Sequence, residues 1–250
     1  MKYDKCVKCG RTSVKFVGKG LCATCCEYKR LGLELIKRVE SVDREEYQII
    51  LGSILGDASI HKTPNSAFFE EVHCLRQEEY LRWKKEKAFK KFKCKIKYKY
   101  NNGFNKSKCI RLWTEVSPVF LEFRKLFYPN GKKIVTNEIL LKLQPLGLAV
   151  WFMDDGTLNL RAGGDISTDG FTKEENILIK NYLDEMGVFC KVFKRKSGTY
   201  KIIINAKGFR NLVKIIKPHI HLIMKYKIDE NRRREYHKKN YKKISPIVRR

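Results

Sequence analysis

The chain has 250 residues, and its 54 Lys and Arg residues against 27 Asp and Glu residues give a net charge of +27. This excess favours nucleic acid over other partners, because a protein that neutralises phosphates releases their counterions. No apolar run approaches the roughly 18 residues of a membrane-spanning helix, and no apolar signal-peptide core follows Met1. Nine cysteines, five of them between residues 6 and 26, indicate a reducing intracellular compartment and a metal site rather than disulfides.

Residues 1–30 contain two Cys-x2-Cys pairs that are separated by twelve residues. This spacing predicts a zinc finger, in which four thiolates hold Zn²⁺ and fix a segment too short to build its own core. Cys26 directly follows the second pair, so either Cys25 or Cys26 can complete the site, and the x2 spacing favours Cys25. The predicted ligands are Cys6, Cys9, Cys22 and Cys25, and residues 31–43 form a linker. The finger is either a passive cap on the enzyme body or an additional DNA contact.

The next elements run from residue 44 to about residue 140. Ser41 or Asp43 caps a helix that ends at Asp57. A strand at 66–73, a helix at 77–91, a hairpin of 94–100 with 108–113, and a helix at 118–128 follow. Alternation in the hairpin places Lys95, Lys97 and Lys99 on one face, and Arg111 lies on the returning strand. This basic face suits a DNA groove, although a solvated lysine face has the same pattern.

A second series of elements occupies residues 141–228. Pro145 begins a strongly apolar helix, for which Gly156 is a suitable C-cap. A strand at 165–168, a helix from the Thr172-x-x-Glu175 capping box to about 186, a hairpin of 189–194 with 200–205, and a helix at 208–216 follow. Lys194 and Lys196 in this hairpin are further candidates for DNA contacts. Residues 229–250 form a basic tail that either contacts phosphate or serves solubility.

Two apolar helices end in carboxylates, at Asp57 and at Asp155. Acidic groups at a helix C-terminus face the negative pole of the helix dipole, which costs up to about 1 kcal/mol each, and a bound cation would offset this cost. A solvated Asp-Asp-Gly turn is the alternative reading of the second stretch. The two stretches align with an offset of 98 residues, which predicts two similar half-domains. Small residues, namely Gly52, Gly56 and Ala149, would let the two helices touch and bring the carboxylates within reach of shared metal ions.

Two stretches of the chain resemble the paired motifs of single-chain LAGLIDADG homing endonucleases, in particular the yeast mitochondrial omega-intron subgroup. They read Ile50-Leu51-Gly52-Ser53-Ile54-Leu55-Gly56-Asp57-Ala58 and Leu148-Ala149-Val150-Trp151-Phe152-Met153-Asp154-Asp155-Gly156. The resemblance covers roughly residues 44–228. It implies an α+β fold of two pseudo-symmetric halves, each with an antiparallel DNA-binding sheet.

The resemblance also implies the chemistry of the site. The family places a metal-binding carboxylate at the eighth motif position, which corresponds here to Asp57 and Asp155, with two or three Mg²⁺ ions at the helix interface. Gly56 and Asp154 are expected to add backbone carbonyl ligands. The subgroup's two further catalytic lysines correspond to Lys133, in the pair Lys132-Lys133, and to Lys227.

The implied function is a monomeric, site-specific double-strand DNA endonuclease that cuts across the minor groove and leaves short 3′ overhangs. An RNA maturase that assists the splicing of its own intron is the first alternative. A DNA-binding regulator without catalysis is the second, but it would give the two carboxylates no reason to persist.

Overall fold

The computed structural model describes residues 16–18, 21–22, 42–100, 108–160 and 163–231. The chain divides into two units, residues 1–151 and 152–250, and the boundary falls within helix α6 (Pro145–Asp155). Each unit contains one four-stranded antiparallel sheet with helices packed against it. The expected α+β fold with two similar halves is therefore confirmed.

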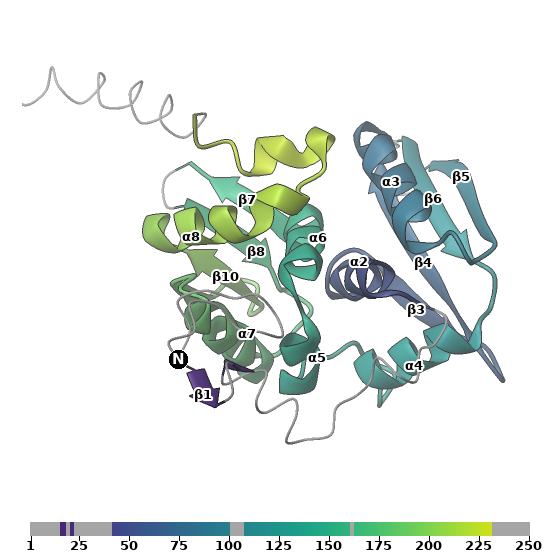
Figure 1. Ribbon diagram of the computed structural model, residues 1–250, viewed down its shortest axis with the longest axis horizontal. Coiled ribbons are helices and arrows are strands. Elements are labelled where there is room, and N and C mark those ends of the chain that lie inside the picture. Colours follow the sequence, from purple (N-terminus) through teal and green to yellow (C-terminus); the bar gives the residue numbers. More distant parts are fainter. Residues whose placement is uncertain (1–15, 19–20, 23–41, 101–107, 161–162, 232–250) are drawn as a thin grey trace, which may run out of the picture. The chain divides into compact units, whose positions relative to one another are not determined.

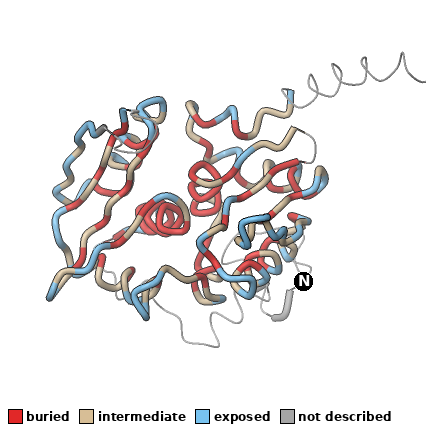
Figure 2. Tube along the Cα trace, turned by 180° about the vertical axis from the view of Figure 1, so that it is seen from behind, coloured by how far each residue is buried: buried red, intermediate tan, exposed pale blue. Residues whose placement is uncertain are grey.

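The first unit is organised around α2 (Arg44–Leu55), which begins at a capping box. The Asp43 carboxylate accepts from the Glu46 N–H, and the Glu46 carboxylate accepts from the Asp43 N–H, so two N-terminal donors of the helix are satisfied. From Glu46 to Leu55 every residue of α2 is buried, as the continuous red coil in Figure 2 shows. A helix that is buried on all faces needs small residues where another helix approaches it closely.

Gly52 provides the close approach to α6. A Cβ atom at Gly52 would lie 2.3 Å from the Gly147 carbonyl oxygen and 2.8 Å from the Val150 Cβ atom. The expected contact of small residues between the motif helices is therefore present, but Gly147, rather than Ala149, faces Gly52. Gln48 adds polar contacts at the same crossing, since its amide donates to the Lys142 carbonyl and accepts from the Gln144 N–H.

The first sheet has the strand order β3-β4-β6-β5 (Figure 1). Helices α3 and α4 pack against one of its faces, where ring contacts join Phe69, Phe89, Phe92 and Phe120. The elements of this unit after α2 are β3 (Ser59–Lys62), β4 (Ala67–Cys74), η2 (Leu75–Gln77), α3 (Glu78–Ala88), β5 (Cys94–Tyr100), β6 (Lys108–Thr114), α4 (Pro118–Phe127) and α5 (Asn137–Lys142). A short hairpin of β1 (Phe16–Gly18) and β2 (Leu21–Cys22) precedes them.

The second unit repeats this arrangement with the strand order β7-β8-β10-β9 (Figure 1). Helices α7 and α8 pack on one face of the sheet, and Phe209 of α8 fills the space above Gly164. The predicted capping box of α7 is confirmed, with Thr172 and Glu175 bonded to each other's backbone. The elements are β7 (Gly156–Asn159), β8 (Gly163–Ser167), α7 (Lys173–Glu185), β9 (Cys190–Lys194), β10 (Tyr200–Ile204), α8 (Ala206–Ile216), η3 (Lys217–His219) and η4 (Leu222–Lys227).

One feature of the predicted order was wrong, because each motif helix is followed by two strands rather than one. β3 and β7 have four residues each and lie at one edge of their sheets. Gly156 opens β7 instead of capping α6 as a separate turn residue. Such short strands show little alternation of polar and apolar residues in the sequence. They form because they pair with β4 and β8.

Candidate active site and nucleic-acid surface

The end of the first motif helix holds an accessible carboxylate beside an anchored lysine. Helix α2 ends at Leu55, and the Asp57 side chain that follows is 40% exposed. The Lys133 ammonium donates to the carbonyl oxygens of Gly56 at 3.1 Å and of Ala58 at 2.9 Å. These two bonds fix one positive charge on the residues that flank Asp57.

The end of the second motif helix is built in the same way within its own unit. The Lys227 ammonium donates to the carbonyl oxygens of Met153 and Asp154, the latter at 2.8 Å. Lys227 is 8% exposed, and Asp155 is half-buried. Each unit therefore ties one lysine from a distant part of the chain to the carbonyls at its motif end, at the two positions that the motif resemblance selected.

The same hydrogen bonds bear on the predicted carbonyl ligands for Mg²⁺. The Gly56 and Asp154 carbonyl oxygens each accept from an ammonium group. A carbonyl oxygen has a second lone pair, but a divalent ion on it would lie close to a fixed positive charge. Within each unit the carboxylate at the motif end, Asp57 in the first and Asp155 in the second, is therefore the better candidate ligand for a divalent ion, because carboxylates are hard oxygen ligands.

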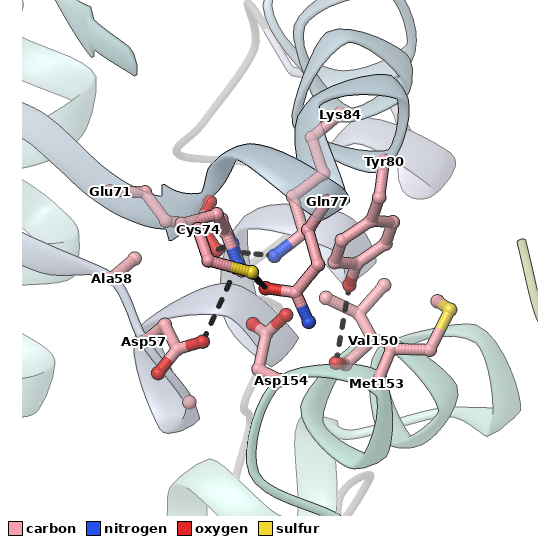
Figure 3. A network of polar contacts seen from close by, with 12 residues as sticks. Asp57, Ala58, Glu71, Cys74, Gln77, Tyr80, Lys84, Val150, Met153 and Asp154 are labelled. Carbon is pink, nitrogen blue, oxygen red and sulfur yellow. Dashed lines mark hydrogen bonds and ion pairs between the residues drawn. The ribbon is translucent and has the colours of Figure 1, made fainter. Parts of the chain in front are cut away.

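A chain of buried charged groups, which sequence reasoning missed, lies behind Asp57 (Figure 3). The Lys84 ammonium of α3 contacts Glu71 of β4, and both side chains have no exposed surface. The Glu71 Oε1 atom also accepts from His73 Nε2 at 2.8 Å, and His73 Nδ1 lies 3.7 Å from Asp57 Oδ2. The sequence signal was present, since Glu71 and His73 occupy the inward positions of an alternating strand.

Glu71 remains ionised in this network. Burial raises its pKa, but attraction to Lys84 and to His73, both hydrogen-bonded to the carboxylate, outweighs burial and lowers the pKa to about 2. Because an ionised carboxylate only accepts hydrogen bonds, His73 Nε2 must be the donor. Removal of Lys84 would leave this buried carboxylate without its cation.

The face of the first sheet opposite α3 and α4 carries the basic residues predicted for DNA. The register places Lys95 opposite Trp113, Lys97 opposite Arg111 and Lys99 opposite Cys109, so these side chains share the face that α3 and α4 leave open. The three lysines are exposed. Arg111 forms an ion pair with Glu70 at 2.6 Å, and its guanidinium lies 4.8 Å from the centre of the Trp113 ring.

The second sheet presents a different set of lysines from the predicted one. Lys191 and Lys201 lie on its open face, the latter paired with Asp165 at 2.9 Å. Lys194 is exposed at the end of β9, but its register position belongs to the face that α7 covers. Lys196 is exposed in the turn between β9 and β10. The sequence did not determine which lysines share a face, because that depends on strand register.

The predicted zinc ligands Cys6, Cys9 and Cys25 lie outside the described residues, and Cys22 ends β2. The basic tail is described only to residue 231. Within the part of the chain that is described, every helix is too short or too polar to cross a membrane.

Comparison with known proteins identifies the family of this architecture. Residues 47–212 match the LAGLIDADG DNA endonuclease family. The cytochrome b mRNA maturase bI2 of Debaryomyces hansenii is 31% identical over 208 residues, which cover 78% of each chain. The RecA protein of Mycolicibacterium flavescens is 25% identical over 74% of this chain and 46% of its own length, so this chain spans about half of that relative.

Among solved structures, the homing endonuclease I-WcaI bound to its DNA recognition sequence superimposes with a TM-score of 0.66. The match covers 86% of this chain and 95% of that one, at 23% sequence identity. At this identity the likeness establishes the shared fold and leaves activity to be argued from the site.

Proposed function

Because the chain belongs to the LAGLIDADG DNA endonuclease family, we propose that it is a site-specific endonuclease that hydrolyses both strands of DNA with divalent metal ions. One observation carries the proposal. In each unit an Asp residue lies at or just beyond the end of the motif helix, and a lysine, Lys133 or Lys227, is fixed to the carbonyls beside it. A protein that only binds DNA has no need for two such matched sets.

The proposed roles follow from the chemistry of the groups. Asp57 and Asp155 hold the divalent ions, with Mg²⁺ as the expected ion, because carboxylates are the oxygen ligands that Mg²⁺ binds most readily. Bound ions would supply an activated water and positive charge at the scissile phosphates. Lys133 and Lys227 place ammonium groups beside the carboxylates, where they stabilise negative charge that develops on phosphate.

The open faces of the two sheets are the proposed DNA-binding surface. Lys95, Lys97 and Lys99 are exposed on a single strand, and the second sheet contributes Lys191 and Lys201. Lys194 and Lys196 remain candidates at the end of the second hairpin. Lysines on solvent-accessible strands neutralise phosphate charge, whereas Arg111, beside Glu70 and Trp113, is suited to contact base edges.

Several finer properties are part of the proposal through family resemblance. We expect the chain to act as a monomer on a long target, to cut across the minor groove and to leave short 3′ overhangs. We also expect a structural Zn²⁺ ion on Cys6, Cys9, Cys22 and Cys25. A mobile intron is the genetic element that such an enzyme would serve, inside a reducing intracellular compartment.

The second candidate function is an RNA maturase that assists splicing. The observation in its favour is that the relative with 31% identity is a cytochrome b mRNA maturase. The basic sheet faces could bind structured RNA as well as DNA, since phosphate contacts are common to both. The two functions differ in whether the carboxylates at the motif ends are required.

The test is a comparison of cleavage and binding in Asp57→Asn and Asp155→Asn variants. The substitution keeps the size of each side chain and removes the charge that holds the metal. We expect loss of double-strand cleavage with DNA affinity nearly unchanged, measured by gel shift in Ca²⁺. Full cleavage by either variant would refute the metal assignment. If the protein still assists the splicing of its intron RNA when both substitutions are present, the maturase is favoured.

A further inference from the structure

His73 directs one ring nitrogen toward Asp57 at the end of the first motif helix. The distance from His73 Nδ1 to Asp57 Oδ2 is 3.7 Å. Metal–nitrogen and metal–oxygen bonds are each about 2.1 Å long, so one ion between the two atoms can contact both at an angle of about 120°. The separation therefore suits two ligands of one ion, with little movement of either side chain.

The His73 ring is held in this orientation by buried neighbours. It is 3% exposed, its Nε2 donates to Glu71, and its ring meets that of Tyr80 edge-on at 5.6 Å. Glu71 is in turn neutralised by Lys84. Histidines that ligate metals in proteins commonly donate their other ring N–H to a carboxylate, which fixes the tautomer and aims the free nitrogen at the ion.

Gln77 also contacts this nitrogen, with its Oε1 atom 3.0 Å from His73 Nδ1. Gln77 is half-buried, and it directly precedes α3. A rotation of its side chain moves the amide away from the imidazole without a change in the helix. The contact is therefore compatible with entry of an ion between His73 and Asp57.

We propose that His73 is a metal ligand, and that with Asp57 it forms a position for a divalent transition-metal ion such as Mn²⁺. Glu71 and Lys84 are positioning residues for the imidazole. The proposal rests on the proposed function, in which Asp57 is a metal-binding carboxylate. It also assigns a purpose to a fully buried charge network that the phosphodiester chemistry of Asp57 and Lys133 does not itself require.

The identity of the ligand predicts a metal preference in the first unit. Imidazole binds Mn²⁺, Co²⁺ and Zn²⁺ more readily than Mg²⁺, which prefers oxygen ligands. We expect His73→Gln in the full chain to weaken Mn²⁺ binding at least about tenfold and to change Mg²⁺ binding by less than about threefold. Isothermal titration of each ion measures this difference. His61→Gln is the matched control, because His61 lies on the same sheet, on the face opposite His73.

A spectroscopic measurement keeps the proposal testable if His73→Gln does not fold. Pulsed electron paramagnetic resonance of bound Mn²⁺ detects a directly coordinated imidazole nitrogen. We expect this coupling in the wild-type chain, and also in a variant in which His61, His219, His221 and His237 are all replaced by Gln, so that His73 is the only imidazole.

The outcomes separate this proposal from the proposed function. Bound Mn²⁺ without nitrogen coupling in the wild-type chain would overturn the role of His73 and leave the carboxylate site standing. Equal Mn²⁺ affinity in His73→Gln and His61→Gln would overturn it as well. If Mn²⁺ and Mg²⁺ both fail to bind the wild-type chain, the proposed metal centre itself fails.

Discussion

The contact between Gly52 and α6 gives the most direct test of how the first unit is packed. In Gly52→Ala, the added methyl group would lie 2.3 Å from the Gly147 carbonyl oxygen, about 1 Å inside the 3.4 Å at which ordinary contact begins. The obstructing atom belongs to the backbone, so the helices must separate or tilt. Such overpacking costs about 1–3 kcal/mol, while the higher helix propensity of Ala returns at most about 1 kcal/mol.

We therefore expect Gly52→Ala to lower the stability of the full chain by about 1–2 kcal/mol. This corresponds to a decrease in Tm of about 2–8 °C for a chain of this size, measured by calorimetry. Gly170→Ala is the control, because nothing lies within 4 Å of the position that its Cβ would occupy. An increase in Tm for Gly52→Ala would refute the close packing of the two helices.

The remaining predictions concern charge. Lys84→Met should destabilise the chain by about 3–5 kcal/mol, because Glu71 would be left buried without its cation, whereas Lys84→Met with Glu71→Leu should recover most of that loss in urea unfolding. If Lys84→Met alone is as stable as the wild type, the result contradicts the buried ion pair of Lys84 and Glu71. Because the pKa of Glu71 is lowered in the folded chain to about 2, its contribution to stability is fully present above pH 4.5 and is lost as the pH falls toward 2. The stability difference between wild type and Glu71→Gln should shrink between pH 5 and pH 3, and a constant difference would contradict the assignment. Lys97→Ala combined with Lys99→Ala should remove about two phosphate contacts, so the DNA affinity should fall less steeply with salt concentration than in the wild type. Lys125→Ala on α4 should leave this salt dependence unchanged.

Elements with strong local signals were predictable from the sequence. The capping box at Thr172 and the pair of candidate N-caps Ser41 and Asp43 marked two helix starts, and the structure confirms the first and selects Asp43 for the second. The alternation of Cys94–Tyr100 marked β5 with its observed bounds. These signals succeed because the hydrogen bonds and the side-chain period that produce them are local.

Features that depend on contacts distant in sequence were not predictable. Ser59–Lys62 becomes a strand because β4 pairs with it, and the face of Lys194 is set by pairing with Tyr200. The network of Lys84, Glu71 and His73 joins a helix to a strand, so only the fold reveals that Glu71 has a cation beside it.

For the candidate site, the motif resemblance selected two lysines that residue patterns alone did not distinguish. With 54 basic residues in the chain, no local pattern distinguishes Lys133 or Lys227 from surface lysines. The structure places both ammonium groups on motif-end carbonyls, which is the arrangement expected if each serves the adjacent carboxylate. Their catalytic role stays a prediction.

The central claim is that the chain cleaves DNA through its two motif carboxylates. The most direct test is a cleavage assay on a randomised double-stranded DNA library, with the wild-type chain and Asp155→Asn, in Mg²⁺ and in Ca²⁺. We predict cuts at one long sequence, by the wild-type chain in Mg²⁺ alone. Absence of cutting under every condition, together with tight binding to structured intron RNA, would contradict the claim and favour the maturase.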